Sequence, residues 1–440
     1  MTQPLLYQVF ARTWLETTGA RTLADLPEAE LDRLAARGFD HVWLMGVWTL
    51  GPDGLAQARR YFPGRAVVGS PYAIARYAVS PAFGGDAALA ELRAKLAARG
   101  VRLVLDFVPN HTARDHHWIT DAPDLYVREP GGAIACGKDP HFPPWTDTAQ
   151  LDYRIALTRD AMTGQLLAIA GMCDGVRCDM AMLVLPDVFA RTWGGKVAPD
   201  FWSTAIDAVR ARHRDFTFIA EAYWGLERRL QRLGFDFTYD KALYDLLIHA
   251  KLAELPAHLA KDPDEQVRSV RFLENHDEPR LAHELPIPQR TAALYLALTL
   301  PGMRLVHDGQ IEGRKHRMAI QLASRPSEPP DAESIALHEQ LLALLRRPAL
   351  RSGAFRALAA PPPIVAHRWE LGAERIVVAV NYSGAEVATE LALELHGLSA
   401  RTIRLRDLVD GATYERDGDA DLHVVLAPWQ VHVFEISSGP

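Results

Sequence analysis

An arginine and an aspartate stand two positions apart in the apolar segment GVRCDMAML, residues 175–183. Read as a β-strand, this segment places Arg177 and Asp179 on the same face, because successive side chains alternate between the two faces. A guanidinium beside a carboxylate favours the ionised acid, and an aspartate that stays ionised can act as a nucleophile. A buried structural ion pair would use the same spacing, so the remainder of the chain must decide between the two readings.

Short apolar segments alternate with helical segments from residue 5 to about residue 347. The helices are expected between caps such as Asp86 and Gly100. This alternation predicts a parallel sheet with right-handed crossovers, and eight units predict a closed (β/α)₈ TIM barrel of the α/β class. The expected strands are residues 5–11, 41–47, 102–108, 175–183, 216–222, 235–239, 270–273 and 303–307.

Two segments depart from this alternation. After the third strand, residues 112–150 are irregular and rich in Asp, His, Pro and Gly, which indicates a short inserted domain. Period-two alternation without helices begins after residue 350, in RIVVAVNYSG and HVVLAPWQVHVFEI, and is typical of an antiparallel β-sandwich. We therefore predict a barrel from residues 1–111 and 151–350, an inserted domain at 112–150 and a C-terminal β-sandwich at 351–440.

Acidic residues stand at the ends of four expected strands. Active sites of such barrels lie at the C-terminal ends of the strands. Two carboxyl groups, one charged and one protonated, are what the cleavage of a glycosidic bond requires. The sequence therefore predicts glycosidase chemistry at this end of the barrel. The four acids are Asp106, Asp179, Glu221 and Asp277.

Four short motifs, in this order, resemble those of the α-amylase superfamily, glycoside hydrolase family 13. They are DFVPNH at 106–111, GVRCD at 175–179, Glu221 in FIAEAYW, and Asn275-His276-Asp277. The segments LLYQVFART and YAVSPAFGG are also similar to that superfamily, and the likeness covers the whole chain. The resemblance implies a retaining glycosidase or transglycosidase that acts on α-glucosidic bonds of small maltooligosaccharides or related α-glucosides.

The resemblance implies catalytic roles for three acids. Asp179 would be the nucleophile that forms a covalent glycosyl-enzyme. Glu221 would protonate the leaving oxygen and then deprotonate the incoming water or sugar. Asp277 would bind sugar hydroxyls and favour the distorted ring. Two carboxyl groups about 5–5.5 Å apart are the arrangement that retains the anomeric configuration.

Substrate-binding roles also follow from the resemblance. Arg177 would keep the nucleophile ionised, His111 and His276 would hydrogen-bond the sugar beside the scissile bond, and Tyr72 would stack on that sugar. Further aromatic residues near strand ends or in the insertion could be sugar platforms, although packing explains each of them more simply. They are Trp14, Trp48, Trp118, Trp145, Tyr223 and Trp224.

Two positions differ from the pattern of starch-cleaving members. A Lys-His pair that often follows the nucleophile is replaced by Met182 and Leu183, which would make the acceptor side less polar and could favour transfer. An Asp that often binds calcium is replaced by Gln150, which leaves Asn110 as a weak oxygen donor. We therefore expect no required cofactor, consider a calcium site doubtful, and expect a small substrate or an unusual acceptor.

The second loop and the insertion suggest a walled pocket. Residues 51–85 form a long segment with Gly and Pro, and the insertion carries Trp118, His141, Phe142 and Trp145. Both should rise at the catalytic end of the barrel and close one side of it. A closed side favours short oligosaccharides or chain ends over the interior of a polymer.

Composition narrows the class of partner. The formal net charge of −7 and the pI near 6.2 give no basic surface for nucleic acid or an anionic membrane. Three cysteines without a C-x-x-C pair fit a reducing compartment, with no disulfide framework or zinc cluster. The start of the chain lacks a signal-peptide pattern, and no apolar run is long enough to span a bilayer. A cytoplasmic protein is expected, and its oligomeric state stays open.

Three alternatives remain. The first is an endo-acting α-amylase on starch or glycogen. The second is a non-catalytic sugar-binding relative, although such a protein has no physical need for the three acids Asp179, Glu221 and Asp277. The third is a metal-dependent barrel hydrolase, which metal analysis of the purified protein would identify. Its ligands would be Asp106, His111, His276 and Asp277.

Overall fold

The computed structural model describes residues 2–196, 199–395, 402–418 and 420–438. Eight parallel strands form a closed barrel in the order β1-β12-β11-β10-β9-β8-β5-β2, which confirms the predicted fold class. Their bounds are β1 Leu5–Phe10, β2 His41–Met45, β5 Arg102–Phe107, β8 Gly175–Cys178, β9 Thr217–Ala220, β10 Phe237–Tyr239, β11 Ser269–Arg271 and β12 Met303–His307. Every residue of β2, β8 and β9 is buried, as expected for parallel strands covered on both faces.

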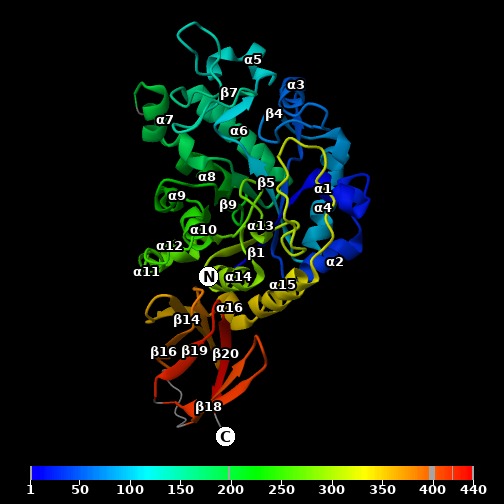
Figure 1. Ribbon diagram of the computed structural model, residues 1–440. Helices are drawn as coiled ribbons and strands as arrows, with labels where there is room; N and C mark the ends of the chain where they lie inside the picture. The colour runs from blue at the N-terminus through cyan, green and yellow to red at the C-terminus, as the bar shows by residue number, and fades with distance from the viewer. Residues whose placement is uncertain (1, 197–198, 396–401, 419, 439–440) are drawn as a thin grey trace. The chain divides into compact units, whose positions relative to one another are not determined.

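Helices follow the barrel strands in sequence (Figure 1). The α-helices are α1 Ala11–Thr18, α2 Glu28–Ala36, α3 Pro52–Tyr61, α4 Gly85–Ala97, α5 Trp118–Asp121, α6 Ala156–Met172, α7 Pro186–Trp193, α8 Trp202–Arg210, α9 Glu227–Arg232, α10 Lys241–Ile248, α11 Leu255–Leu259, α12 Pro263–Val267, α13 Leu281–Glu284, α14 Ile287–Thr299, α15 Ala332–Leu345 and α16 Pro348–Ser352. Short 3₁₀ turns are η1 Leu23–Asp25, η2 Pro81–Phe83, η3 Pro123–Leu125 and η4 Ala181–Val184. Across the described residues, no helix has the length and apolarity needed to cross a bilayer.

The central strand is shorter than the sequence predicts. It ends at Cys178, so Asp179 lies just beyond it, whereas the predicted strand continued to Leu183. Met180 adopts a left-handed backbone conformation, with φ 41° and ψ 47°, and turns the chain into η4. The apolar run after the nucleophile is therefore a buried 3₁₀ turn, which an apolar pattern of this length cannot distinguish from a strand.

The long second loop contains regular structure that the sequence analysis did not predict. Strand β3 (Trp48–Leu50) pairs antiparallel with β4 (Ile74–Val79), and α3 lies between them in sequence. Gly51 precedes α3, and a Cβ built on it would lie 1.8 Å from an oxygen of Asp115. That carboxylate accepts a hydrogen bond from the backbone N–H of Asp53 at 2.8 Å, so the insertion itself caps α3.

The insertion leaves and rejoins the barrel through two short strands. Strand β6 (His111–Ala113) pairs antiparallel with β7 (Thr148–Gln150), and His111 is directly opposite Gln150. This pairing brings together two residues that lie 39 positions apart in the sequence (150 − 111). The predicted site residue His111 is thus tied to the far end of the insertion.

The C-terminal strands form two antiparallel sheets that share one apolar core. Six strands are ordered β13-β14-β15-β20-β17-β18, and β16 pairs with β19. Buried residues from both sheets, among them Val377, Leu391, Leu405 and Leu426, belong to the same cluster, as in a β-sandwich. The strands are β13 Ala354–Leu358, β14 Ile364–Leu371, β15 Glu374–Asn381, β16 Val387–Leu391, β17 Thr402–Asp407, β18 Thr413–Asp417, β19 Leu422–Leu426 and β20 Val431–Ser438.

The chain divides into two compact units. One, called here the N-terminal unit, comprises Leu6–Tyr239 and Met318–Ser327. The other, the C-terminal unit, comprises Met1–Leu5, Asp240–Arg317 and Glu328–Pro440. The domain boundaries expected from the sequence follow a different criterion and stay predictions. The two units are described separately below.

Candidate active site

A single buried guanidinium gathers the acids of the N-terminal unit. Arg177 is completely buried in β8, and its Nη1 lies 2.8 Å from an oxygen of Asp179. Its Nη2 donates to Glu221 at 2.6 Å, and Nη1 lies 3.6 Å from Asp106. The register explains the convergence, because Asp106 on β5 and Ile219 on β9 are the neighbours of Arg177 across the sheet. Three adjacent strands thus deliver three carboxyl groups to one cation.

Aromatic rings enclose the same guanidinium. Its central carbon lies 5.1 Å from the ring centroid of Trp43, 5.2 Å from that of Tyr72 and 5.8 Å from that of Tyr239. Burial acts to lower the pKa of Arg177, but Glu221 is the first of several groups that raise it well above its ordinary value. The arginine is therefore a permanent cation between aromatic faces. Sequence analysis missed Trp43 and Tyr239, although their positions in the second and sixth strands were a usable signal.

Glu221 follows β9 directly and is only 4% exposed. Its Oε2 accepts hydrogen bonds from Arg177 and, at 2.8 Å, from the backbone N–H of Met180. Its Oε1 accepts one from the hydroxyl of Tyr223 at 2.8 Å. The left-handed conformation of Met180 aims its N–H at this carboxylate, so local backbone strain accompanies the site. The structure thus brings Asp179, Glu221, Arg177 and Tyr72 together, as the predicted roles require.

Asp106 is the most deeply buried of these acids. It is 2% exposed, and one of its oxygens accepts from the indole N–H of Trp43 at 3.2 Å. Burial raises its pKa to about 7, with Arg177 acting in the opposite direction and Asp179 adding to the rise. Asp106 therefore accepts a hydrogen bond from the Trp43 indole and lies next to the Arg177 guanidinium.

His111 is held by the insertion. Its Nδ1 lies 3.3 Å from the side-chain amide nitrogen of Asn110, and its ring centroid is 5.2 Å from that of Trp145. Burial lowers the pKa of His111 to about 4, while Asp147 and a hydrogen bond with the Tyr72 backbone act to raise it. A neutral histidine has one donor and one acceptor nitrogen and brings no positive charge to a bound sugar.

The position expected for calcium holds a closed hydrogen-bond network. The side-chain nitrogen of Gln150 donates to the carbonyl of Asn110 at 2.9 Å, to the side-chain oxygen of Asn110 at 3.0 Å and to the carbonyl of Leu151 at 3.0 Å. The oxygen of Gln150 accepts from the Asn110 amide at 3.2 Å. All three oxygens face an N–H₂ group, and the set contains no carboxylate, which fits calcium poorly.

Met182 and Leu183 do not line an acceptor surface, contrary to the sequence interpretation. Met182 is completely buried and Leu183 is 3% exposed within η4. The physical reason is the turn at Met180, which directs the next residues into the interior. These two positions therefore say nothing about the polarity met by a leaving or incoming group.

His276 and Asp277 belong to the C-terminal unit. His276 Nε2 lies 3.0 Å from an oxygen of Asp277, and the Asp277 side chain is 43% exposed. The side chain of Asn275 accepts from the backbone N–H groups of Asp277 and Glu278 at 2.8 and 2.9 Å. This Asx turn fixes the loop that presents Asp277.

The remaining predicted features are mostly structural. Trp14 and Trp48 are buried, which agrees with packing. Within residues 2–196, 199–395, 402–418 and 420–438, no three His, Cys, Asp or Glu side chains form a group that could hold a metal ion. Asp106 and His111, two residues of the metal-hydrolase alternative, are engaged instead with Trp43 and Asn110.

Known proteins with similar sequences agree with the motifs. The family described as "Alpha amylase, catalytic domain" matches residues 9–132. An α-1,4-glucan:maltose-1-phosphate maltosyltransferase of Burkholderia pseudomallei is 27% identical over 325 residues, which cover 69% of this chain and 27% of that protein. A trehalose-6-phosphate hydrolase of Escherichia coli is 31% identical over 121 residues, 27% of this chain and 19% of that protein.

Solved structures match over nearly the full length. A maltogenic α-amylase of Thermotoga neapolitana has a TM-score of 0.77 and 22% identity, with 99% of each chain covered. At this identity the match demonstrates the fold. The chain spans only 27%, 33% and 41% of the first three curated relatives it matches. Together these matches confirm the relation predicted from the motifs.

Substitution Asp106→Asn should weaken the pH dependence of stability. The folded-state pKa of about 7 exceeds the ordinary 3.8, so the folded chain retains a proton that the unfolded chain releases. This stabilising contribution is present below about pH 4 and is lost as the pH rises through about 7, by up to about 1.4 kcal/mol per pH unit. Urea unfolding should show the variant gaining free energy of unfolding relative to wild type across that interval. A constant difference would contradict the raised pKa.

Proposed function

We propose that this chain is a member of the α-amylase family and a retaining enzyme that acts on α-glucosidic bonds through a covalent intermediate on Asp179. The observation that carries the proposal is the pair of carboxylates, Asp179 and Glu221, held by one buried guanidinium. Names of the curated relatives, which include glucosidases and glucan transferases, support the same class of bond. Neither a metal nor an organic cofactor is needed for this chemistry.

The proposed reaction has two steps. In the first, an Asp179 oxygen bonds to the anomeric carbon while the glycosidic bond breaks, and Glu221 gives its proton to the leaving oxygen. In the second, Glu221 takes a proton from water or an acceptor sugar, whose oxygen displaces Asp179. Two inversions at the same carbon retain its configuration. Arg177 keeps Asp179 anionic before attack, because the cation stabilises its charged form.

The other predicted residues bind the sugar in this proposal. In the N-terminal unit, His111 hydrogen-bonds the sugar and Tyr72 offers an aromatic face beside Arg177. In the C-terminal unit, His276 and Asp277 keep the hydroxyl-binding roles that the resemblance implies. Asp277 is well suited to this role because its side chain is 43% exposed and its loop is fixed by Asn275. Burial lowers the pKa of His111 to about 4, and an uncharged His111 avoids repelling the positive charge that develops on the ring in the transition state.

Substitution Asp179→Asn should abolish most turnover while leaving the fold intact. The amide is isosteric but lacks the anionic oxygen that forms the glycosyl ester, so kcat should fall by orders of magnitude. Initial rates on maltotriose, with the melting temperature as a check of folding, measure this. A matched control is Asp32→Asn on α2, which removes only a surface contact with Arg99 and should leave the rate unchanged. Retention of more than roughly a tenth of wild-type turnover would exclude Asp179 as the nucleophile.

Two contacts support a walled substrate pocket. The side chain of Gln57 on α3 donates to the carbonyl of Thr146 at 3.1 Å and accepts from its hydroxyl at 2.9 Å. The Asp115 cap joins the insertion to α3 a second time. The second loop and the insertion therefore form one continuous wall, and residues of both, among them Tyr61 and Trp145, line a hollow of about 400 Å³ where the two meet. Such a wall favours maltose-sized substrates and chain ends.

Maltotriose should accordingly be processed with a higher kcat/KM than soluble starch. An interior segment of a polymer would have to displace the wall, whereas a chain end need not. Side-by-side kinetics measure the ratio, and NMR of the first product gives its anomeric configuration. Faster starch cleavage with internal cuts would support the endo-amylase alternative instead. A first product of β configuration from an α-linked substrate would overturn the retaining mechanism itself.

Whether the glycosyl group passes to water or to another acceptor is a separate question. The same two steps serve either outcome, because Glu221 activates whichever O–H group reaches the intermediate. Product analysis on maltose, trehalose and sucrose, with and without phosphate, separates hydrolysis, transfer and phosphorolysis. The buried positions of Met182 and Leu183 remove one argument that favoured transfer.

We further propose that Gln150 makes the enzyme independent of calcium. Its amide already satisfies the oxygens of Asn110 and Leu151 that a cation would bind. Chelator should therefore leave the melting temperature and activity of wild type unchanged, as thermal unfolding with EDTA and with added calcium will measure. Gln150→Asp offers a matched comparison, because a carboxylate at this position should make the melting temperature rise with calcium. A fall of several degrees in wild type on chelation would contradict the proposal.

A further inference from the structure

The two oxygens of the Glu221 carboxylate have different kinds of partner. Oε2 accepts from Arg177 Nη2 at 2.6 Å and from the backbone N–H of Met180 at 2.8 Å. Both partners are obligate donors, because a guanidinium stays protonated and a backbone amide has no acceptor. A proton on Oε2 would face two other N–H groups. In the acid form of Glu221 the proton therefore belongs on Oε1.

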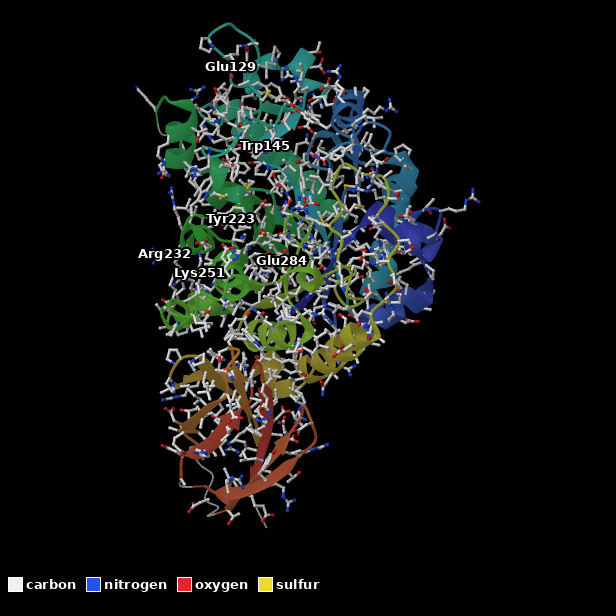
Figure 2. All side chains as sticks on the ribbon, in the orientation of Figure 1. Glu129, Trp145, Tyr223, Arg232, Lys251 and Glu284 are labelled. Atoms are coloured by element: carbon white, nitrogen blue, oxygen red, sulfur yellow. The ribbon has the colours of Figure 1, made fainter. Side chains whose placement is uncertain are left out.

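Oε1 is the oxygen that Tyr223 contacts. The phenol oxygen lies 2.8 Å from Oε1, within the range of a charge-assisted hydrogen bond. Tyr223 is labelled in Figure 2. Unlike the two partners of Oε2, a tyrosine hydroxyl can either donate or accept. It can donate to the carboxylate and accept from the carboxylic acid without moving its ring. The contact is thus compatible with both protonation states of Glu221.

The backbone after Tyr223 forms a tight turn that contains two residues in the left-handed conformation. Trp224 and Gly225 both have positive φ, 65° and 72°, and the N–H of Leu226 donates to the carbonyl of Tyr223 at 3.2 Å. Two left-handed central residues closed by this hydrogen bond form a type I′ turn, in which a tryptophan is unfavourable. The indole of Trp224 is 41% exposed and meets the ring of His141 edge-on at 4.9 Å. The insertion thus contacts the strained residue of the turn.

We propose that Tyr223 is a positioning residue for the acid–base Glu221, with a hydroxyl that reverses its hydrogen bond each time Oε1 gains or loses a proton. The inference rests on the proposed function, since it concerns how Glu221 performs its assigned role. It adds a residue that neither the motifs nor the matched proteins' names assign. Tyr223 lies two residues after Glu221 in the segment FIAEAYW, where the sequence offered only the presence of an aromatic ring.

The step balances without any further reactant. In glycosyl transfer to Asp179, the proton of Oε1 passes to the glycosidic oxygen as the bond to the anomeric carbon breaks. The new carboxylate then accepts the hydroxyl hydrogen of Tyr223. When water or a sugar attacks, its proton goes to Oε1, and the Tyr223 oxygen accepts from the restored acid. Tyr223 ends the cycle with the proton it held at the start.

The variant Tyr223→Phe tests this, because it removes the hydroxyl and retains the ring. Two substrates separate its role from general damage: maltotriose, whose leaving oxygen needs a proton, and α-glucosyl fluoride, whose fluoride leaves without one. Since kcat/KM reports steps up to the first irreversible one, only the maltotriose value should fall. The expected loss is on the order of tenfold to a hundredfold, as for one hydrogen bond to a charged group, with KM little changed. The fluoride value should stay within about threefold of wild type.

A matched control is Tyr295→Phe on α14, which likewise removes one hydroxyl, bonded to the side-chain oxygen of Gln340 at 3.2 Å. It should leave the ratio of the two kcat/KM values at the wild-type level. Equal losses on both substrates in Tyr223→Phe, at a wild-type melting temperature, would overturn the inference, as would no loss on maltotriose. Failure of the proposed function is distinguishable, since wild type itself would then turn over neither substrate.

Discussion

One buried guanidinium sets the constraint that the rest of the site obeys. Arg177 is completely inaccessible, and a cation in that position is tolerated only if anions and hydrogen-bond acceptors surround it. Asp179 and Glu221 supply two close acceptors, while Asp106 lies farther away at 3.6 Å. Removing any one of them would leave charge less well compensated inside the barrel. The same arrangement of charges therefore sets the catalytic geometry and stabilises the strand ends in this chain.

This coupling explains which parts of the site could be predicted from sequence. A period-two pattern places Arg177 and Asp179 on one face, and a parallel barrel aligns the strand ends, so Asp106 was expected at the same end of the barrel. The closed barrel itself was predictable for the same reason. The positions of Trp43 and Tyr239 around the guanidinium needed the sheet order as well, because β2 and β10 lie far apart in the chain.

Other features could not be predicted, because each depends on one backbone torsion or one long-range contact. The left-handed Met180 ends the central strand early and buries Met182, which the apolar pattern presented as an extension of the strand. The replacement at Gln150 was visible in the sequence, but its consequence was not. Only the pairing of β6 with β7 places its amide among the oxygens of Asn110 and Leu151. The same pairing links that amide, through Asn110, to the side chain of His111.

The insertion therefore does more than narrow the entrance of a barrel. Its far end orients Asn110 and hence His111, its Asp115 caps α3, and its His141 meets the strained Trp224 beyond Glu221. Each of these contacts fixes part of the insertion, which has little regular structure, against a neighbouring segment of the chain. The N–H₂ group of Gln150 contributes to this rigidity, because it lies 2.9 to 3.0 Å from three oxygens of Asn110 and Leu151. The positions of the site residues thus depend on side-chain amides, caps and turns around Arg177. The barrel strands bring together the acids that compensate the buried charge of Arg177.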